Sequence, residues 1–251
     1  MTPEFTFGQT EQGALGVAAW GGVGFMRVVV VRHHEGDSAG FIGAAFAARG
    51  AVISTFLFPD GGRPPALDGV DHVVVLGADW SVYDDDPRRA WIADELAWLR
   101  RADAASVPVL GICFGGQALA AALGGTVEAA PRSEIGWFTV DSVDHERIPP
   151  GPWLEFHSDR FVPPPQASVL ATGPVGIQAF SLGRHLGVQF HPEPDAAQLR
   201  VWLDGGGREM AERAGTDPDQ FLKQTLAEER AARSRAAALV ASALRIAHPP
   251  A

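Results

Sequence analysis

The sequence predicts an α/β domain of three layers, in which helices cover both faces of a mostly parallel sheet. Short β-branched runs alternate with helical stretches over the first half of the chain, as is typical of parallel sheets. A length of 251 residues with 46% hydrophobic residues is sufficient for one large core. Between residues 126 and 190 the pattern changes to short strand-like pieces separated by Pro and Gly, which predicts extra strands at the sheet edge.

Four strands and three helices are expected in the first half. The strands are residues 27–32, 51–58, 72–76 and 107–112, which are short apolar runs typical of buried strands. The helices are residues 39–49, a helix that starts at Asp86-Pro87, and residues 116–123. Asp37 and Ser38 are expected to cap the first helix and Gly50 to end it. Asp86 is expected to cap the second helix, with Pro87 at its first position.

Helices return near the end of the chain, over residues 195–203 and over a long stretch that Asp217-Pro218 opens and that runs to about residue 247. Apolar positions recur along the long helix, so we expect it to dock on its own domain. The predicted organisation is a flexible extension over residues 1–25, a main domain over 26–204 and a C-terminal helical extension over 205–251.

The composition argues against several classes of function. A net charge of −10 argues against broad binding to nucleic acid or anionic membranes, because both would repel the chain. No run reaches the roughly 18–20 apolar residues that span a bilayer. The apolar run over residues 13–26 lacks the basic leader of a secretion signal, so a cytoplasmic protein is expected. One cysteine excludes an intrachain disulfide and a cysteine zinc cluster.

That cysteine, Cys113, stands where a buried strand is expected to pass directly into a helix. Gly111 and Gly115 flank it in a G-x-C-x-G pattern, the cysteine version of a nucleophile elbow. The two glycines leave room for a sharp, strained turn that exposes the sulfur. The following helix N-terminus favours the thiolate, and the N–H of Phe114 is aimed where an oxyanion would form. An inert buried cysteine in a tight turn is the alternative.

A second polar group ends another strand-like run. His191 follows residues 187–190, and Glu193 stands two residues further on, after Pro192. Because active sites gather at the carboxyl ends of parallel strands, His191 and Cys113 are expected to meet. The histidine can take the thiol proton and later give it to a leaving amine, and Glu193 can hold its ring.

No metal or cofactor is predicted. The stretch His33-His34-Glu35 offers possible ligands, but adjacent histidines on an extended strand point in opposite directions, so these are expected to be loop or rim residues. Three aspartates at residues 84–86 are acidic enough for a cation, yet Asp86 is better explained as a helix cap.

The elbow over residues 111–117 and the later His191-Pro-Glu193 resemble the two-part signature of class I glutamine amidotransferases, with the resemblance extending over about residues 27–203. Three further stretches are similar to the stand-alone, GMP-synthase-like branch: residues 81–85, 134–137 and 156–159. The resemblance implies a flavodoxin-like fold. It also implies attack of Cys113 on the amide of glutamine, with release of ammonia and a γ-glutamyl thioester that water resolves.

The resemblance assigns further roles. An N–H from the loop Gly77-Ala78-Asp79 would join Phe114 in the oxyanion hole. Gln117 and the backbone near His157-Ser158 would hold the amino-acid end of the substrate. One departure is notable, because the family commonly has Gly-Gly-Pro where this chain has residues 77–79. Alanine tolerates positive φ poorly, so the amide needs another route into position.

Several functions remain open. The chain lacks an ATP-binding P-loop and a Ser-Gly-Gly-x-Asp-Ser stretch, so one hypothesis is an ammonia-releasing protein that serves a separate synthetase. A second is a self-contained hydrolase of γ-glutamyl amides, and a third is a non-catalytic regulatory module of the same fold. A cysteine-dependent α/β hydrolase shares the elbow but fits the His-Pro-Glu spacing poorly.

Overall fold

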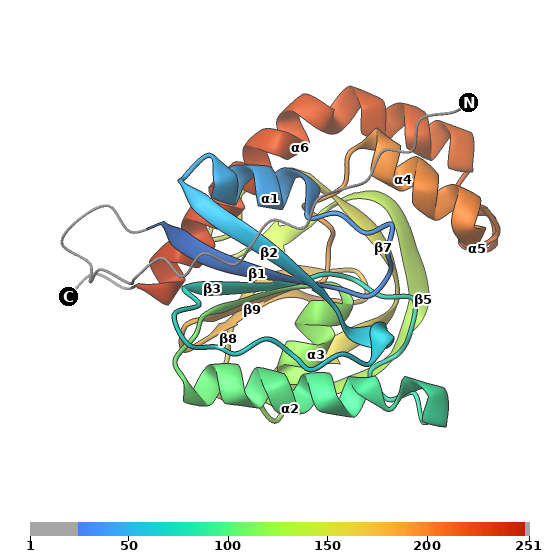
Figure 1. Ribbon diagram of the computed structural model, residues 1–251. Coiled ribbons are helices and arrows are strands. Elements are labelled where there is room, and N and C mark those ends of the chain that lie inside the picture. Colours follow the sequence, from blue (N-terminus) through green and yellow to red (C-terminus); the bar gives the residue numbers. More distant parts are fainter. Residues whose placement is uncertain (1–24, 249–251) are drawn as a thin grey trace, which may run out of the picture.

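The computed structural model describes residues 25–248, so the extension predicted over residues 1–25 lies almost wholly outside the described residues. An eight-stranded sheet forms the centre of the fold (Figure 1). Its strands in spatial order are β2 (Ala51–Leu57), β1 (Met26–Arg32), β3 (His72–Val75), β4 (Val109–Ile112), β10 (His185–Val188), β9 (Gly176–Leu182), β8 (Ser168–Gly173) and β6 (Asp141–Ser142). The first five are parallel and the remaining pairings are antiparallel, which confirms the predicted fold class.

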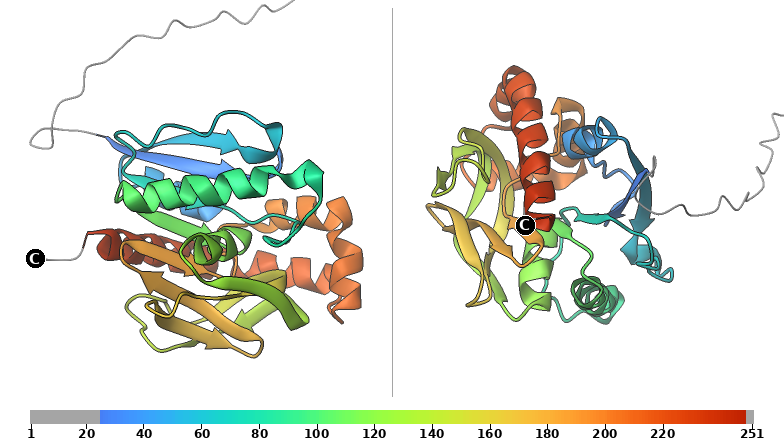
Figure 2. Two further views of the ribbon diagram at one scale, coloured as in Figure 1. Left: turned by 90° about the horizontal axis from the view of Figure 1, so that it is seen from below. Right: turned by 90° about the vertical axis from the view of Figure 1, so that its left-hand side faces the viewer.

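Helices cover both faces of this sheet. Helices α1 (Gly40–Ala47) and α6 (Pro218–Ala247) pack on one face, and α2 (Trp91–Ala104) and α3 (Phe114–Ala122) pack on the other. The right-hand view of Figure 2 shows α6 and α2 on opposite sides of the sheet. Successive side chains of a strand point to opposite faces of the sheet, so each strand contributes to both cores. Val28 and Val30 of β1 face α1, whereas Val29 and Val31 face α2.

The second half of the chain departs from the expectation in one respect. Strands β6, β8 and β9 extend the edge of the main sheet as predicted, but β5 (Thr126–Thr139) and β7 (Pro152–Val162) pair only with each other in a separate antiparallel ribbon. A register shift between Ala129 and Glu134 bends this ribbon. It curves along one side of the molecule in Figure 1. Phe161 of β7 packs edge-on against Phe180 of β9, which ties the ribbon to the main sheet.

The C-terminal helices pack against this ribbon. Helix α4 (Ala196–Trp202), a π turn η3 (Leu203–Gly207) and α5 (Arg208–Arg213) precede α6, and α5 was not predicted. Asp217, which was expected to open the long helix, caps it by accepting the N–H of Gln220 at 3.0 Å. Asp195, expected as the first residue of its helix, is instead the cap of α4 and accepts the N–H of Gln198 at 2.8 Å. Apolar residues of α6 belong to the same core as the sheet and α1. The domain boundary at residues 204/205 stays a prediction.

Some element ends differ from those expected. Helix α1 starts one residue late, with Ala39 at the cap, because the Asp37 carboxylate instead accepts the N–H groups of His33 and His34. Asp86 caps only a short 3₁₀ turn, η2 (Pro87–Arg89), before α2 begins. Strand β2 ends before residue 58, where it was expected to end, because a 3₁₀ turn, η1 (Phe58–Asp60), begins there. No helix among the described residues is long and apolar enough to cross a membrane.

Candidate active site

Cys113 lies between β4 and α3 in the strained conformation expected of an elbow, with φ 51° and ψ −111°. The flanking glycines are needed for close backbone approach. A β-carbon on Gly111 would lie 2.4 Å from the carbonyl oxygen of Gly115, and one on Gly115 would lie 2.2 Å from that of Val75. Backbone contact therefore leaves no room for larger residues on either side, and the turn presents the Cys113 side chain at the carboxyl edge of the sheet.

His191 reaches the same edge from the neighbouring strand. Strand β10 runs parallel to β4, with Val188 beside Ile112, so the segments that follow them lie side by side. The N–H of His191 donates to the carbonyl of Leu154 at 2.7 Å, which fixes the backbone. A β-carbon on Gly77 would lie 2.8 Å from His191 Cε1 and 3.7 Å from Cys113 Cβ. Cysteine, histidine and the loop after β3 therefore meet at one point.

Glu193 completes this group. Its Oε1 lies 2.7 Å from His191 Nδ1, and both side chains are buried. Burial alone would lower the pKa of His191. The charge of Glu193, followed by the charge of Cys113 and hydrogen bonds to both residues, instead raises the pKa of His191 well above its ordinary value of 6.5. An imidazolium beside the sulfur favours the thiolate, so the group is suited to nucleophilic chemistry.

A cavity of about 500 Å³ opens over these residues. Five of the nine residues given a catalytic, oxyanion or substrate role from the sequence line it: Gly77, Ala78, Cys113, His191 and Glu193. The rest of its wall comes from the loop before α1, from the loop after β3, from β7 and from the α4–α5 segment, namely His34, Gly36, Asp37, Ser38, Leu76, Asp79, Phe156, Val201, Trp202, Gly205, Gly206, Gly207, Met210 and Arg213.

The loop after β3 is compatible with alanine. Among the described non-glycine residues only Ser106 and Cys113 have positive φ, and Gly77 has no positive φ either. The conformation of Ala78 therefore carries no strain of the kind that the sequence suggested. Leu76 accepts the N–H of Gly115 at 3.1 Å, which holds this loop against the start of α3, where the Phe114 amide lies.

Gln117 and Ser158 lie close to this centre but do not line its cavity. Gln117 Nε2 donates to the carbonyl of Asp159 at 3.2 Å and to Gln189 Oε1 at 3.4 Å. Gln189 Nε2 in turn lies 3.7 Å from Cys113 Sγ. Ser158 lines a neighbouring cavity of about 350 Å³ and shares a hydrogen bond of 2.8 Å with Ser133. Their roles in substrate binding stay predictions.

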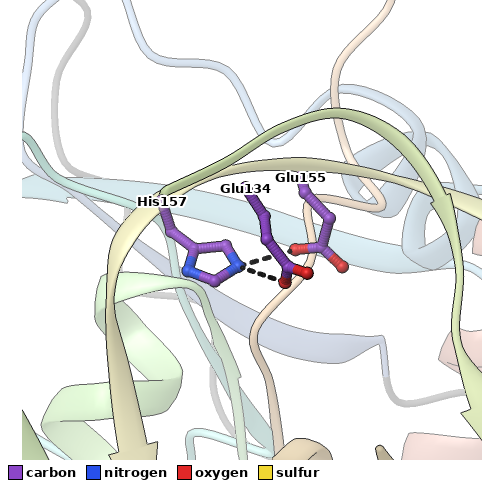
Figure 3. Close-up of side chains that lie close together, drawn as sticks. All are labelled: Glu134, Glu155 and His157. Carbon is purple, nitrogen blue, oxygen red and sulfur yellow. Dashed lines mark ion pairs between the residues drawn. The ribbon is translucent and has the colours of Figure 1, made fainter. Parts of the chain in front are cut away.

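His157 is buried between two carboxylates rather than open to the cavity (Figure 3). Its Nε2 lies 3.3 Å from Glu134 Oε2 and 3.2 Å from Glu155 Oε2. Its Nδ1 donates to the carbonyl of Asp159 at 2.8 Å. Burial opposes the charge on His157, but hydrogen bonds to Glu134 and then Glu155 raise its pKa to about 10.

This group is the one set of described His, Cys, Asp and Glu side chains arranged closely enough to hold a metal ion, with one ligand atom from each residue within 4.8 Å of the others. The raised pKa of His157 means that a proton on the imidazole competes with any cation. No metal site was predicted here.

The supporting sequence motifs converge on the same segment. Ser81 and Tyr83 both donate to the Asp159 carboxylate, Tyr83 at 2.8 Å. Gln178 on β9 donates to Glu134 Oε2 at 2.9 Å. The three stretches over residues 81–85, 134–137 and 156–159 are therefore brought together although they lie far apart in the sequence.

Sequence reasoning missed several residues around the cysteine. His33 was expected at a loop or rim, but it is 2% exposed and contacts both Glu95 and Gly77. It lies in the bend that follows β1, as expected of a loop residue, but its side chain is buried between Glu95 of α2 and Gly77 instead of standing at the rim. Its position at the carboxyl end of β1 was the available signal. Trp202 packs edge-on against the His191 ring, with the ring centroids 4.9 Å apart, and no pattern in the sequence pointed to this residue.

The fold and the site define a class of α/β proteins with a cysteine elbow and a histidine–glutamate pair at the carboxyl edge of the sheet. The family model for class I glutamine amidotransferases matches residues 65–199, which is more than half of the chain. The chain therefore belongs to the class I glutamine amidotransferase family, and it is of the GMP-synthase-like type.

Sequence relatives and solved structures agree with this assignment. The chain is 36% identical to a glutamine-hydrolyzing GMP synthase subunit of Sulfolobus acidocaldarius over 137 residues, which are 51% of this chain and 69% of the relative. It is 35% identical to the glutamine-hydrolyzing GMP synthase of Nitrobacter hamburgensis over 143 residues, but these span only 25% of that relative. A glutamine amidotransferase structure from Thermotoga maritima superposes with a TM-score of 0.80 at 25% identity, covering 90% of this chain and 100% of that chain.

Proposed function

We propose that this chain hydrolyses the side-chain amide of glutamine through a thioester on Cys113. The observation that carries the proposal is the buried His191–Glu193 pair, 2.7 Å apart, beside a strained cysteine that lines the same cavity. Family membership and the names of the GMP synthase relatives support glutamine as the substrate.

The proposed reaction has two stages. The Cys113 thiolate attacks the amide carbon, and the N–H groups of Phe114 and Ala78 stabilise the oxyanion. The C–N bond then breaks, and the nitrogen leaves as ammonia with the proton from His191, so that a γ-glutamyl thioester remains. Water then adds its oxygen to the acyl carbon and gives one proton to His191; the carbon–sulfur bond breaks, which releases glutamate and restores the thiolate–imidazolium pair. Glu193 holds the imidazole ring in the orientation that both transfers need.

Hydroxylamine trapping tests this route. The wild type with glutamine should form γ-glutamyl hydroxamate, because hydroxylamine intercepts the thioester, and should release ammonia. Cys113→Ser should lose both signals by at least ~10³-fold, since the nucleophile is gone. Ammonia release without any hydroxamate, or undiminished turnover by Cys113→Ser, would overturn the thioester mechanism.

We further propose that the ammonia serves a separate synthetase. The Sulfolobus relative is named as one subunit of a glutamine-hydrolyzing GMP synthase, and the chain itself lacks a recognisable ATP-binding motif. Glutamine turnover that rises strongly when a synthetase is added would support this role, and turnover unchanged by any such protein would count against it. The cytoplasmic location expected from the sequence is part of the same proposal.

One observation favours a second candidate, the self-contained hydrolysis of γ-glutamyl amides. The wall of the cavity beyond His191 carries an apolar patch beside Arg213, and its members Val201 and Met210 remain 54% and 36% exposed. Ammonia leaving from glutamine has no need of an apolar wall, whereas the amine part of an N-substituted γ-glutamyl amide would bury apolar surface there.

A comparison of substrates distinguishes the two candidates. If the second is correct, γ-glutamyl anilide is turned over faster than glutamine by the isolated chain, and Val201→Ser with Met210→Ser lowers only the anilide rate. Leu226→Ser is the matched control, because Leu226 is 55% exposed on α6 and does not line the cavity. A preference for glutamine that the paired serine variants leave unchanged would refute it.

A further inference from the structure

The motif His33-His34-Glu35 has no part in the steps above, yet its first histidine lies directly behind the loop that follows β3. His33 is 2% exposed, at the end of β1. Its Nε2 lies 3.0 Å from Oε2 of Glu95, a residue of α2 that is itself fully buried. Its Nδ1 lies 2.8 Å from the carbonyl oxygen of Gly77. A strand, a helix and the active-site loop are therefore joined through one imidazole.

The direction of these hydrogen bonds follows from the partners. A carbonyl oxygen only accepts, so Nδ1 of His33 carries the proton and donates to Gly77. The Glu95 carboxylate faces the other ring nitrogen and holds the ring at this angle. Asp37, whose carboxylate accepts the backbone N–H of His33 at 3.3 Å, is the second acidic group facing this residue. Together these charges outweigh the effect of burial and raise the pKa of His33.

Fixing the Gly77 carbonyl also fixes the next amide. In a trans peptide the C=O of Gly77 and the N–H of Ala78 point in opposite directions. Gly77 and Ala78 line the cavity whereas His33 does not. The carbonyl therefore points away from the cavity toward His33, and the Ala78 N–H points toward the site where the oxyanion forms.

His33 also touches the second arm of the oxyanion site. Its ring packs edge-on against Phe114, with centroids 4.9 Å apart, and Phe114 follows the nucleophile directly. At the far end of the loop, His34 Nε2 lies 3.1 Å from the Asp79 carboxylate. Both ends of the Gly77–Asp79 loop are thus contacted by neighbouring histidines.

We propose that His33, held by Glu95, is the positioning residue of the oxyanion site. It orients the Ala78 amide through the Gly77 carbonyl and supports the Phe114 ring beside the nucleophile. This gives the loop a fixed peptide plane without the glycine and proline that are common in the family at residues 78 and 79. The inference rests on the proposed amide hydrolysis for its kinetic consequence but not for its structural one.

Three variants test it. His33→Phe removes the donor to Gly77, and His33→Asn keeps a donor close to the position of Nδ1. His185→Phe is the matched control, since His185 is also buried and pairs with Asp103 at 3.0 Å but lies at the start of β10, away from the cavity. Loss of an oxyanion donor lowers kcat about 10²–10³-fold, so we expect His33→Phe to lose kcat by at least ~10-fold with little change in KM. His33→Asn should recover part of this loss.

Two measurements decide the outcome. A loss of kcat in His33→Phe that equals the loss in His185→Phe would show that any buried histidine has the same effect and would overturn the inference. Crystal structures of the wild type and His33→Phe provide a readout independent of turnover. We expect the Gly77–Ala78 peptide to rotate in the variant, and an unchanged peptide plane would also overturn the inference. If the wild type fails to hydrolyse glutamine while the peptide still rotates in His33→Phe, the proposed function alone is refuted.

Discussion

Replacing Gly77 by alanine tests how closely the loop after β3 approaches His191. The added β-carbon would lie 2.8 Å from His191 Cε1, whereas ordinary contacts begin at 3.4 Å. Either the imidazole or the loop must therefore move by about 0.6 Å. Gly77 has no positive φ, so backbone strain makes no contribution to the result. The variant thus isolates a displacement at the site.

The size of the effect follows from this displacement. A shift of ~1 Å at a catalytic group can cost about 10²-fold in rate, so a shift of about 0.6 Å is expected to lower kcat by about 10-fold or more. Overpacking a dense region costs ~1–3 kcal/mol, which lowers Tm by several degrees for a chain of this size. Steady-state ammonia release and thermal unfolding measure the two effects.

Gly205→Ala is the matched control. Gly205 lines the same cavity, but a β-carbon there meets no atom within 4 Å. Its kcat and Tm should remain close to those of the wild type. Gly77→Ala with an unchanged kcat, or Gly205→Ala with an equal loss, would refute the reasoning that the Gly77–His191 contact limits this position.

Three further predictions concern ionisable groups. In Glu193→Gln the carboxylate that contributes most to the raised pKa of His191 is absent, so the pH dependence of Cys113 alkylation should shift, and an unshifted profile would contradict the pairing. The pKa of His157 is raised from 6.5 to about 10. The imidazolium of His157 therefore contributes fully to stability below pH 6.5, and this contribution is lost as the pH rises to about 10. Thermal unfolding of His157→Gln should lack this alkaline decline. Burial lowers the pKa of His72 to about 4, so on acidification the unfolded state binds a proton first and stability should fall between pH 6.5 and 4. His72→Phe should reduce this loss of stability in acid, and a variant whose stability falls in the same way as that of the wild type would exclude His72 as the source.

The sequence predicted those parts of the fold that local patterns determine. Strand β1 and the opening of α6 at Asp217 were placed correctly because β-branched runs and capping side chains act over a few neighbouring residues. The elbow at Cys113 was also predictable, since flanking glycines signal a close backbone approach wherever they occur.

Features that depend on long-range packing were not predictable. The ribbon of β5 and β7 has the composition of edge strands, and nothing local in its sequence shows that the two strands pair only with each other and meet the main sheet through side chains such as Phe161 on Phe180. The burial of His33 in its loop was missed for the same reason, because nothing near it in the sequence reveals Glu95, 62 residues later, as its partner. The pairing of His157 with two carboxylates likewise depends on strand register.

Covalent labelling tests the central claim most directly. Intact-mass and peptide mass spectrometry after treatment with a glutamine-analogue chloroketone should show one adduct per chain, located on Cys113, and excess glutamine should slow its formation. An unmodified chain, or an adduct on another residue with Cys113 left free, would contradict the assignment of Cys113 as the nucleophile for a glutamine-like substrate.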